Sequence, residues 1–248
     1  SMSRVVKMSD NKDKKKQHIG RPTFWAVASG KGGVGKSFVA SSEAITLARM
    51  GHSAVLVDFD LSGSNLHSCL GIQTSKIGLK QFFVGETKDV ESLLVPTHLP
   101  KLRLLQWAWD SWSSVYVNVD QIGVLMDALS KVKAEFVIFD LGSGVNDVYL
   151  EILKNVDNRV LVTSPEITSI EKLYRFIEAN IVYSLQSKVN TQELPILFKE
   201  LRLNRTSGVD LLNSFLQFVR NSFPEAASEV DYLSQAPISL VINSSRSQ

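Results

Sequence analysis

A glycine-rich segment with two lysines is the part of the sequence whose residue types and spacing point most directly to chemistry. Residues 30–37 read GKGGVGKS and satisfy the phosphate-binding pattern G-x-x-x-x-G-K-S. Glycines let a backbone wrap closely round an anionic phosphate chain, and successive N–H groups at the start of a helix attract its charge. Lys36 is suited to neutralise the β- and γ-phosphates and the Ser37 hydroxyl to bind Mg²⁺, so the segment predicts a site for ATP or ADP with Mg²⁺. The expected nucleotide contacts are Gly30, Lys31, Gly32, Gly33, Val34, Gly35, Lys36, Ser37 and Phe38.

Carboxylates stand at the ends of two predicted strands further along the chain. The run AVLVD is followed by Asp60, and the run EFVIFD ends in Asp140. Ligands bind beyond the carboxyl ends of the strands in open α/β sheets, so these side chains are expected beside the phosphate loop. Asp140 is expected to hold Mg²⁺ directly or through water. The other candidate metal ligands are Ser37 and Asp60. Asp58 is expected to shape the loop or the outer shell of the metal.

Short apolar runs alternate with segments of helical periodicity, which is the pattern of a mostly parallel sheet with helices on both faces. Buried strands are expected near residues 23–28, 54–58, 102–106, 135–140, 159–163 and 238–242. Helices are expected near residues 62–70, 118–132, 147–155, 167–186 and 208–222, with a short helix around 193–201. The phosphate loop then lies between the first strand and a helix over residues 36–50, which is the context that its motif requires.

The charge of the chain is divided unevenly. Residues 1–22 carry seven Lys and Arg against two Asp, a net charge of +5, whereas the remainder holds 20 basic and 23 acidic residues. This predicts a basic, disordered tail over residues 1–22 and one slightly acidic domain over residues 23–248, which does not look like a general nucleic-acid binder. Contact of the tail with DNA or with an anionic lipid surface is the alternative.

Cysteine usage and the lack of long apolar runs indicate the compartment. Cys69 is the one cysteine among 248 residues, which excludes an intrachain disulfide and a multi-cysteine metal site. No apolar run is long enough to cross a membrane, and no signal peptide is evident. A reduced, cytoplasmic location is therefore expected, with peripheral attachment at a membrane or cell pole as an extension of it.

Lys31, the lysine of the loop that the general phosphate-binding pattern does not require, narrows the class of nucleotide-binding protein. Lys31 completes the pattern K-G-G-x-G-K-S, by which the chain resembles the deviant Walker A ATPases of the ParA/MinD superfamily. The resemblance implies a P-loop NTPase fold, slow ATP hydrolysis stimulated by a partner, and an ATP-dependent homodimer in which Lys31 reaches the partner's nucleotide. It also implies that Asp60 orients or activates the attacking water, while capping of the following helix is the alternative role.

Further positions follow from the same resemblance. Asp140 and the LGSG after it resemble the second switch D-x-P-x-G, with Gly142 in place of the usual proline and Gly144 as the glycine whose N–H senses the γ-phosphate. Asn243, at the end of the last strand, matches the asparagine that reads the adenine edge, and Arg246 is expected to flank the base. An asparagine after a strand is also common in turns.

Within the superfamily, residues 60–71, 140–144 and 163–177 are similar to the MinD-like proteins, which include FlhG, an ATPase of flagellar number and placement. This similarity implies an ATP-driven switch that positions or regulates a cellular assembly with an unidentified protein partner. The chain stops just past Asn243, before the membrane-targeting helix of MinD-like proteins, so it is either truncated at the C-terminus or unusually short.

Other functions of the superfamily stay open. A ParA-type DNA-partition ATPase would hold nonspecific DNA as the ATP dimer, and a nucleotide-binding scaffold would have lost turnover. An iron–sulfur carrier needs thiolates at a subunit interface, which a single cysteine disfavours. The tryptophans Trp107, Trp109 and Trp112 form either a docking patch or a cluster buried under a loop.

Overall fold

The computed structural model describes residues 4–7, 20–61, 63, 66–107, 115–186, 188–189, 196, 199, 209–235 and 238–244. Its strands are β1 (Arg4–Lys7), β2 (Thr23–Ser29), β3 (Ala54–Phe59), β4 (Val95–Pro96), β5 (Leu102–Leu105), β6 (Phe136–Ser143), β7 (Asn158–Thr163) and β8 (Ile238–Ile242). They form one sheet in the order β1-β8-β7-β2-β6-β3-β5-β4. The pairs from β8 to β5 are parallel, and the two edge strands β1 and β4 are antiparallel to their neighbours.

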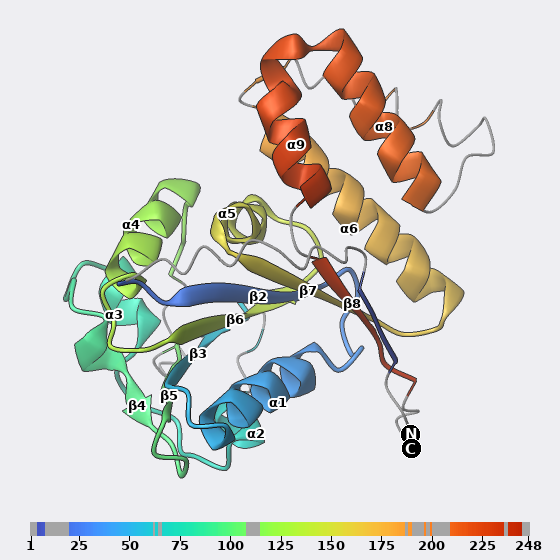
Figure 1. The fold of residues 1–248 in the computed structure, drawn as a ribbon. Helices are drawn as coiled ribbons and strands as arrows, with labels where there is room; N and C mark the ends of the chain where they lie inside the picture. The colour runs from blue at the N-terminus through green and yellow to red at the C-terminus, as the bar shows by residue number, and fades with distance from the viewer. Residues whose placement is uncertain are drawn as a thin grey trace.

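Helices cover both faces of this sheet, as expected (Figure 1). The helices are α1 (Lys36–Arg49), α2 (Leu66–Cys69), α3 (Leu79–Phe83), α4 (Val119–Leu129), α5 (Asp147–Asn155), α6 (Ile167–Leu185), α8 (Val209–Ser222) and α9 (Ala227–Gln235), with short 3₁₀ turns at Glu91–Leu93 and Pro224–Ala226. Helices α1 and α2 lie on one face, and α4, α5 and α6 lie on the other. Helices α8 and α9 pack on each other, and α9 lies against α6 and reaches β7, where Tyr232 accepts a hydrogen bond from Arg159.

The sheet is buried on both sides because its strands are apolar on both sides. Every residue of β3 is buried, and so are the last four residues of β2. Helix α1 lies close to these strands because its buried face consists mainly of small residues, Ala40, Ser41, Ala44 and Ala48. A larger apolar cluster fills the space between the opposite face and the helices α4, α5 and α6. The two clusters hold the carboxyl ends of the central strands in place.

The structure differs from the sequence-based expectations at several elements. Strand β1 lies inside the stretch 1–22, where a tail was expected, and α2 is shorter than the helix expected over residues 62–70. Helices α3 and α9 and strand β4 were not predicted, because α3 and β4 are short and α9 buries only Val230. The helix expected over 193–201 lies outside the described residues, apart from helical Ile196 and Lys199. Among the described residues, no helix is long and apolar enough to cross a membrane.

Candidate nucleotide-binding site

The phosphate loop, residues 30–37, joins β2 to α1 in a conformation that its glycines make possible. Gly33 and Gly35 have φ angles of 77° and 89°, a left-handed region that residues with a Cβ rarely adopt. Gly35 precedes α1, and no side chain caps the first turn of this helix. Gly30 lies so close to the backbone of Lys172 on α6 that a Cβ there would not fit. The loop therefore wraps the uncapped, partly positive N-terminus of a helix, which suits an anionic ligand.

A buried ion pair lies beside the loop. The Lys36 Nζ atom is 2.5 Å from the Asp140 Oδ1 atom, and only 7% and 1% of these side chains are exposed. The Ser37 hydroxyl lies near the same carboxyl group and acts to lower its pKa. Burial raises the pKa of Asp140 above its usual value, while the Lys36 ammonium and the Ser37 hydroxyl oppose this shift. The fold thus brings together the three side chains that the sequence analysis assigned to phosphate and Mg²⁺.

The two aspartates near the end of β3 have different surroundings. Asp58 is fully buried, in register with Asp140 on the neighbouring strand, and its Oδ2 atom accepts the N–H of Leu66 at 3.1 Å. This bond shapes the loop before α2, which is one of the two roles expected for Asp58. Asp60 lies beyond the strand and is partly exposed, and its charge adds to the effect of burial on the pKa of Asp140. Asp60 is therefore close to the candidate metal ligands.

Tyr149 belongs to the site although the sequence analysis did not single it out. It lies on α5, is 3% exposed, and its hydroxyl oxygen accepts the N–H of Leu61 at 3.1 Å. A Cβ at Gly142 would collide with this hydroxyl and lie 2.9 Å from the Asp60 Oδ1 atom. The proline usual in relatives would therefore not fit beside Tyr149. In the sequence, the glycine at position 142 in place of the usual proline was the feature that could have pointed to a large side chain beside it, since a glycine leaves room for one.

Lys31 is held within its own chain. Its Nζ atom lies 2.5 Å from Glu166 Oε2, just before α6, and 3.4 Å from Thr168 Oγ1 in the first turn of that helix. The hydrogen bond and charge of Lys31 lower the pKa of Glu166 below its usual value. About a third of the Lys31 side chain is exposed, so it borders solvent and does not enter the buried part of the site. Reaching a nucleotide on a second chain would require the pair with Glu166 to open.

Two other expected nucleotide contacts make bonds within the protein. The Gly144 N–H donates to the Ser29 carbonyl oxygen at 3.0 Å, so sensing a γ-phosphate through this N–H would require that bond to break. The Asn243 Nδ2 atom donates to the Val34 carbonyl oxygen at 3.0 Å. The end of β8 is thereby joined to the phosphate loop, which lies two strands away in the sheet. The adenine-reading role of Asn243 stays a prediction.

The remaining expected residues are spread over the surface and beyond the described chain. Phe38, in the first turn of α1, is 71% exposed. Arg246 lies outside the described residues, as do Trp109 and Trp112. Trp107 packs on the larger apolar cluster and stacks on Phe83 at a centroid distance of 5.6 Å, so burial, one of its two expected roles, describes this tryptophan.

The residues of the site fit a nucleotide phosphate with Mg²⁺. The loop is open round Gly33, where a Cβ would meet no atom within 4 Å. Lys36, Ser37 and Asp140 provide a cation, a hydroxyl and a carboxylate at one place. Within the described part of the chain there is no cluster of three or more His, Cys, Asp or Glu residues suited to a metal. Mg²⁺ usually takes one or two protein carboxylates and completes its shell with phosphate oxygens and water, and Asp140 provides one carboxylate beside the loop.

Comparisons with known proteins agree with this geometry. The family model described as "ParA: NUBPL iron-transfer P-loop NTPase" matches residues 22–190. The putative septum site-determining protein MinD of Oltmannsiellopsis viridis is 27% identical over 175 residues, which cover 69% of this chain and 55% of that protein. The septum site-determining protein MinD of Synechocystis is 30% identical over 152 residues, which cover 61% and 56%.

A solved structure shows the same similarity in three dimensions. The septum site-determining protein MinD of Pyrococcus horikoshii, complexed with Mg-ADP, superposes with a TM-score of 0.55 at 25% identity. The superposition covers 62% of this chain and 63% of that one. In sequence, the chain spans little more than half the length of the two curated MinD proteins named above.

Proposed function

The chain belongs to the ParA/MinD superfamily of P-loop NTPases, and from this premise we propose that it is an ATP-dependent switch ATPase. Binding of ATP would join two copies, and the dimer would position or regulate a cellular assembly, as in spatial regulation of the MinD or FlhG type. The observation that carries the proposal is the phosphate loop, whose Lys36 and Ser37 meet Asp140 in a buried cluster while Lys31 stays at the surface. One lysine is thus available for each chain's own phosphates and one for a partner's.

Hydrolysis would need little covalent chemistry from the protein. In phosphoryl transfer the protein mainly positions the reactants and stabilises charge, and Mg²⁺ neutralises charge on the phosphates when bound. Lys36 would hold the β- and γ-phosphates, and Ser37 and Asp140 would provide metal ligands or contacts to metal-bound water. Asp60 would orient the attacking water at the opening of the loop. Release of the γ-phosphate would then relax the segments round Asp60 and Gly144.

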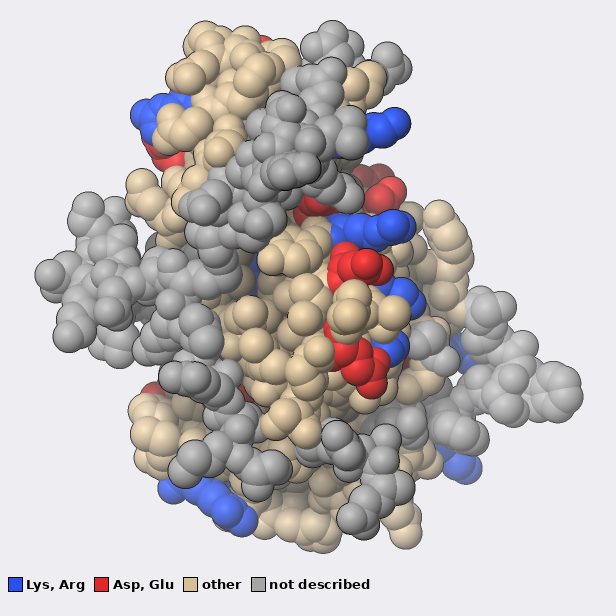
Figure 2. Space-filling view, turned by 90° about the vertical axis from the view of Figure 1, so that its right-hand side faces the viewer, with Lys and Arg blue, Asp and Glu red and all other residues tan. Residues whose placement is uncertain are grey.

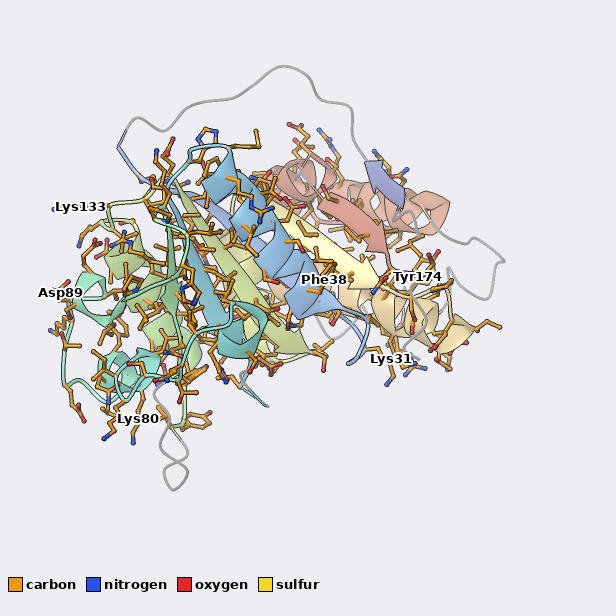
Figure 3. The ribbon with its side chains drawn as sticks, turned by 90° about the horizontal axis from the view of Figure 1, so that it is seen from below. Lys31, Phe38, Lys80, Asp89, Lys133 and Tyr174 are labelled. Atoms are coloured by element: carbon orange, nitrogen blue, oxygen red, sulfur yellow. The ribbon has the colours of Figure 1, made fainter. Side chains whose placement is uncertain are left out.

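An exposed apolar surface supports the homodimer. Phe38, Val145, Ile167, Ile170 and Tyr174 each expose between 39% and 77% of their surface. Figure 3 shows Phe38 and Tyr174 in the same part of the view as Lys31. Exposed apolar side chains such as these are suited to burial against a second copy, in which the same residues would meet by two-fold symmetry.

Iron transfer, which the description of the family model names, is not part of this proposal. Iron–sulfur clusters are bound by thiolates, and the chain has the single cysteine Cys69. Burial and the negative charges of Asp140 and Asp58 raise the pKa of the Cys69 thiol, which disfavours the thiolate.

We propose a protein partner rather than DNA as the surface on which the switch acts, because residues 23–248 hold 20 basic against 23 acidic residues. On the face shown in Figure 2, Lys and Arg lie among Asp and Glu and do not form a broad basic area. Nonspecific DNA binding depends on several phosphate contacts from gathered cations. The proposed location is cytoplasmic, with peripheral attachment at a membrane or cell pole as an extension of it.

The solution mass of the protein tests the switch. Asp60→Ala, which is expected to block turnover, would be measured by light scattering with Mg²⁺-ATP, with Mg²⁺-ADP and without nucleotide. We expect a monomer that doubles in mass only with ATP. Lys31→Ala in the same background should stay monomeric, because it lacks the lysine proposed to reach the partner. Glu166→Gln should strengthen the dimer, because it frees Lys31 from its own chain.

Calorimetry with ATP on the same samples separates the parts of the proposal. If ATP binds and the mass stays that of a monomer, the dimer switch is wrong for this chain. If ATP does not bind at all, a scaffold without nucleotide chemistry replaces the ATPase. Retention on DNA at low salt that appears only with ATP would favour the DNA-partition alternative.

A further inference from the structure

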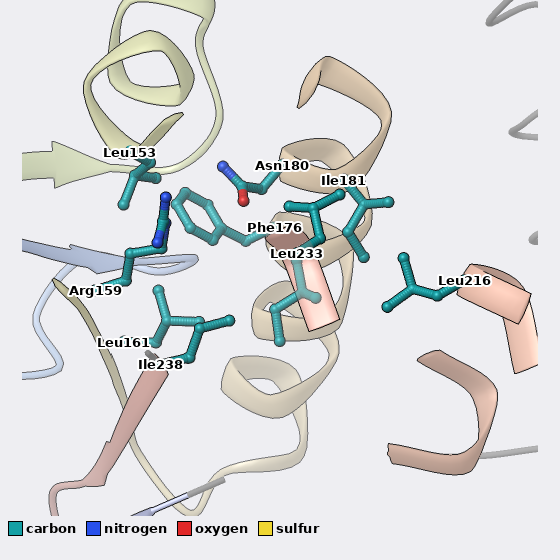
Figure 4. A pocket seen from close by; sticks show the side chains of 10 residues that line it. Leu153, Arg159, Leu161, Phe176, Asn180, Ile181, Leu216, Leu233 and Ile238 are labelled. Carbon is teal, nitrogen blue, oxygen red and sulfur yellow. The ribbon is translucent and has the colours of Figure 1, made fainter. Parts of the chain in front are cut away.

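Strand β8 is the least buried of the parallel strands. Each of its residues is partly exposed, whereas every residue of β3 and all of β7 except its first residue are buried. Ile238, the first residue of β8, lines a pocket of about 40 Å³ together with Leu161 of β7 and Phe176 of α6 (Figure 4). Because side chains do not fill this space, burial contributes less to the position of β8 than to that of the inner strands.

The end of β8 nevertheless carries a residue of the candidate nucleotide site. The Asn243 N–H donates to the Thr163 carbonyl oxygen of β7 at 2.8 Å. The Asn243 Nδ2 atom donates to the Val34 carbonyl oxygen at 3.0 Å, and a Cβ at Gly35 would collide with the same Nδ2 atom. The side chain thus lies directly against the phosphate loop. Any shift of β8 would therefore move the residue that is expected to contact the base.

Strand β1 gives β8 a second neighbour in the sheet (Figure 1). The backbone of Arg4–Lys7 pairs antiparallel with Ser239–Ile242, and Arg4 lies opposite Ile242, next to Asn243. Without β1, β8 would be an outer strand, since the order of the sheet is β1-β8-β7-β2. An outer strand has N–H and C=O groups without a strand partner on one side, and it opens more readily than an inner strand. Pairing with β1 thus compensates for the burial that β8 lacks.

We propose that β1 is a positioning strand for the base of the bound nucleotide. By pairing along β8 as far as Ile242, β1 holds Asn243 at the phosphate loop, where the Asn243 amide contacts the edge of the base. β1 acts through this amide and not on the phosphates, which bind at the loop and the start of α1. The inference rests on the proposed nucleotide-binding function and adds to it a role for residues 4–7.

A backbone variant of β1 tests this role without a change in the charge of the chain. In an antiparallel pair, the N–H groups of consecutive residues point to opposite sides. The double variant Val5→Pro/Val6→Pro, called the β1 variant, therefore removes one N–H that faces β8. In the nucleotide-free protein, the backbone amides of β8 should exchange hydrogen faster in the β1 variant. Val95→Pro, in the opposite edge strand β4, is the matched control and should leave β8 exchange unchanged.

Calorimetry with Mg²⁺-ATP and with Mg²⁺-tripolyphosphate separates the base from the phosphates. We expect the β1 variant to bind ATP about three- to tenfold more weakly, which is the range for the loss of one hydrogen bond. Its affinity for tripolyphosphate, which has no base, should stay within about twofold of the wild-type value. In an Asn243→Ala background, the β1 substitutions should cause no further loss of ATP affinity, because the contact through which β1 acts is already absent.

Three results would overturn the positioning role. They are an unchanged affinity of the β1 variant for ATP, an equal loss of affinity for tripolyphosphate, and a full further loss in the Asn243→Ala background. An equal loss for both ligands would mean that the variant disturbs the loop or the fold as a whole. A wild-type protein that does not bind ATP would overturn the proposed function, and the base contact with it.

Discussion

At the scale of single residues, the site contains two lysine–carboxylate pairs that differ in their exposure to solvent. Lys36 and Asp140 form a pair that solvent hardly reaches, whereas Lys31 and Glu166 pair at the surface. Breaking a buried pair leaves an uncompensated charge, and surface pairs open at little cost. This difference suits a fixed lysine for a chain's own phosphates and a releasable lysine for a partner's.

The pKa of Glu166 provides a direct measure of the Lys31 contact. The hydrogen bond from Lys31 lowers the pKa of Glu166 below the usual value of a glutamate carboxyl group. The stabilisation from the pair is therefore present above the unfolded pKa and is lost as the pH falls through the lower folded pKa. An NMR titration of the Glu166 carboxyl carbon should show this lowered value and its return to the usual range in Lys31→Ala. An unchanged pKa in Lys31→Ala would mean that the two side chains do not pair in solution.

Tyr149 is expected to position the segment that carries Asp60. Tyr149→Phe removes the acceptor of the Leu61 N–H, a part-buried hydrogen bond whose net contribution is about 0.5–1.5 kcal/mol. We expect the ATPase rate to fall about tenfold while ATP affinity, measured by calorimetry, stays within about twofold, since Tyr149 does not line the phosphate loop. A matching loss in Tyr183→Phe, whose hydroxyl contacts Glu151 elsewhere, would indicate a general packing effect and contradict the positioning role.

At the scale of elements, α1 lies close to the sheet because small residues face it. Ala44 is fully buried between α1 and the strands. Ala44→Leu should destabilise the protein by about 1–3 kcal/mol, because the added carbon atoms have no space. Urea unfolding would measure this, with Thr46→Leu on the exposed face of the same helix as the control. Equal stability of the two variants would mean that α1 is not held tightly against the sheet.

At the scale of the whole molecule, the nucleotide site draws on elements that are distant in sequence. The loop between β2 and α1, the ends of β3 and β6, and Asn243 after β8 all meet at one edge of the sheet. A ligand bound there stabilises the folded state by mass action, which amounts to about 2.7 kcal/mol at a hundred times its dissociation constant. Nucleotide binding at this edge of the sheet should therefore raise the free energy of unfolding of the whole protein.

Thermal unfolding with and without Mg²⁺-ADP would measure this coupling. We expect the midpoint of the wild-type protein to rise by several degrees with Mg²⁺-ADP. Lys36→Met should lose the rise, because the cation at the phosphates is gone. Lys101→Met, which changes an exposed lysine remote from the loop in sequence, should retain it. A rise that persists in Lys36→Met would place the nucleotide elsewhere on the molecule.

The parallel sheet, the phosphate loop and the carboxylates at strand ends were determined by the sequence itself, because they follow from local patterns. Apolar runs such as AVLVD specify buried strands, and the glycines at 33 and 35 specify a turn with positive φ. The superfamily followed from the same short motifs. Elements with weak periodicity, such as α9, were missed because they lack a clear local pattern.

Only the tertiary structure decided which of these residues meet and with what they pair. The bond of Lys31 to Glu166, that of Asn243 to Val34 and that of Arg159 to Tyr232 join positions 135, 209 and 73 residues apart along the chain. Local sequence patterns carry no record of such contacts, since side chains distant in sequence come together only when strands and helices pack. The chemistry available at the loop was visible in its residues, and its partners were set by the fold.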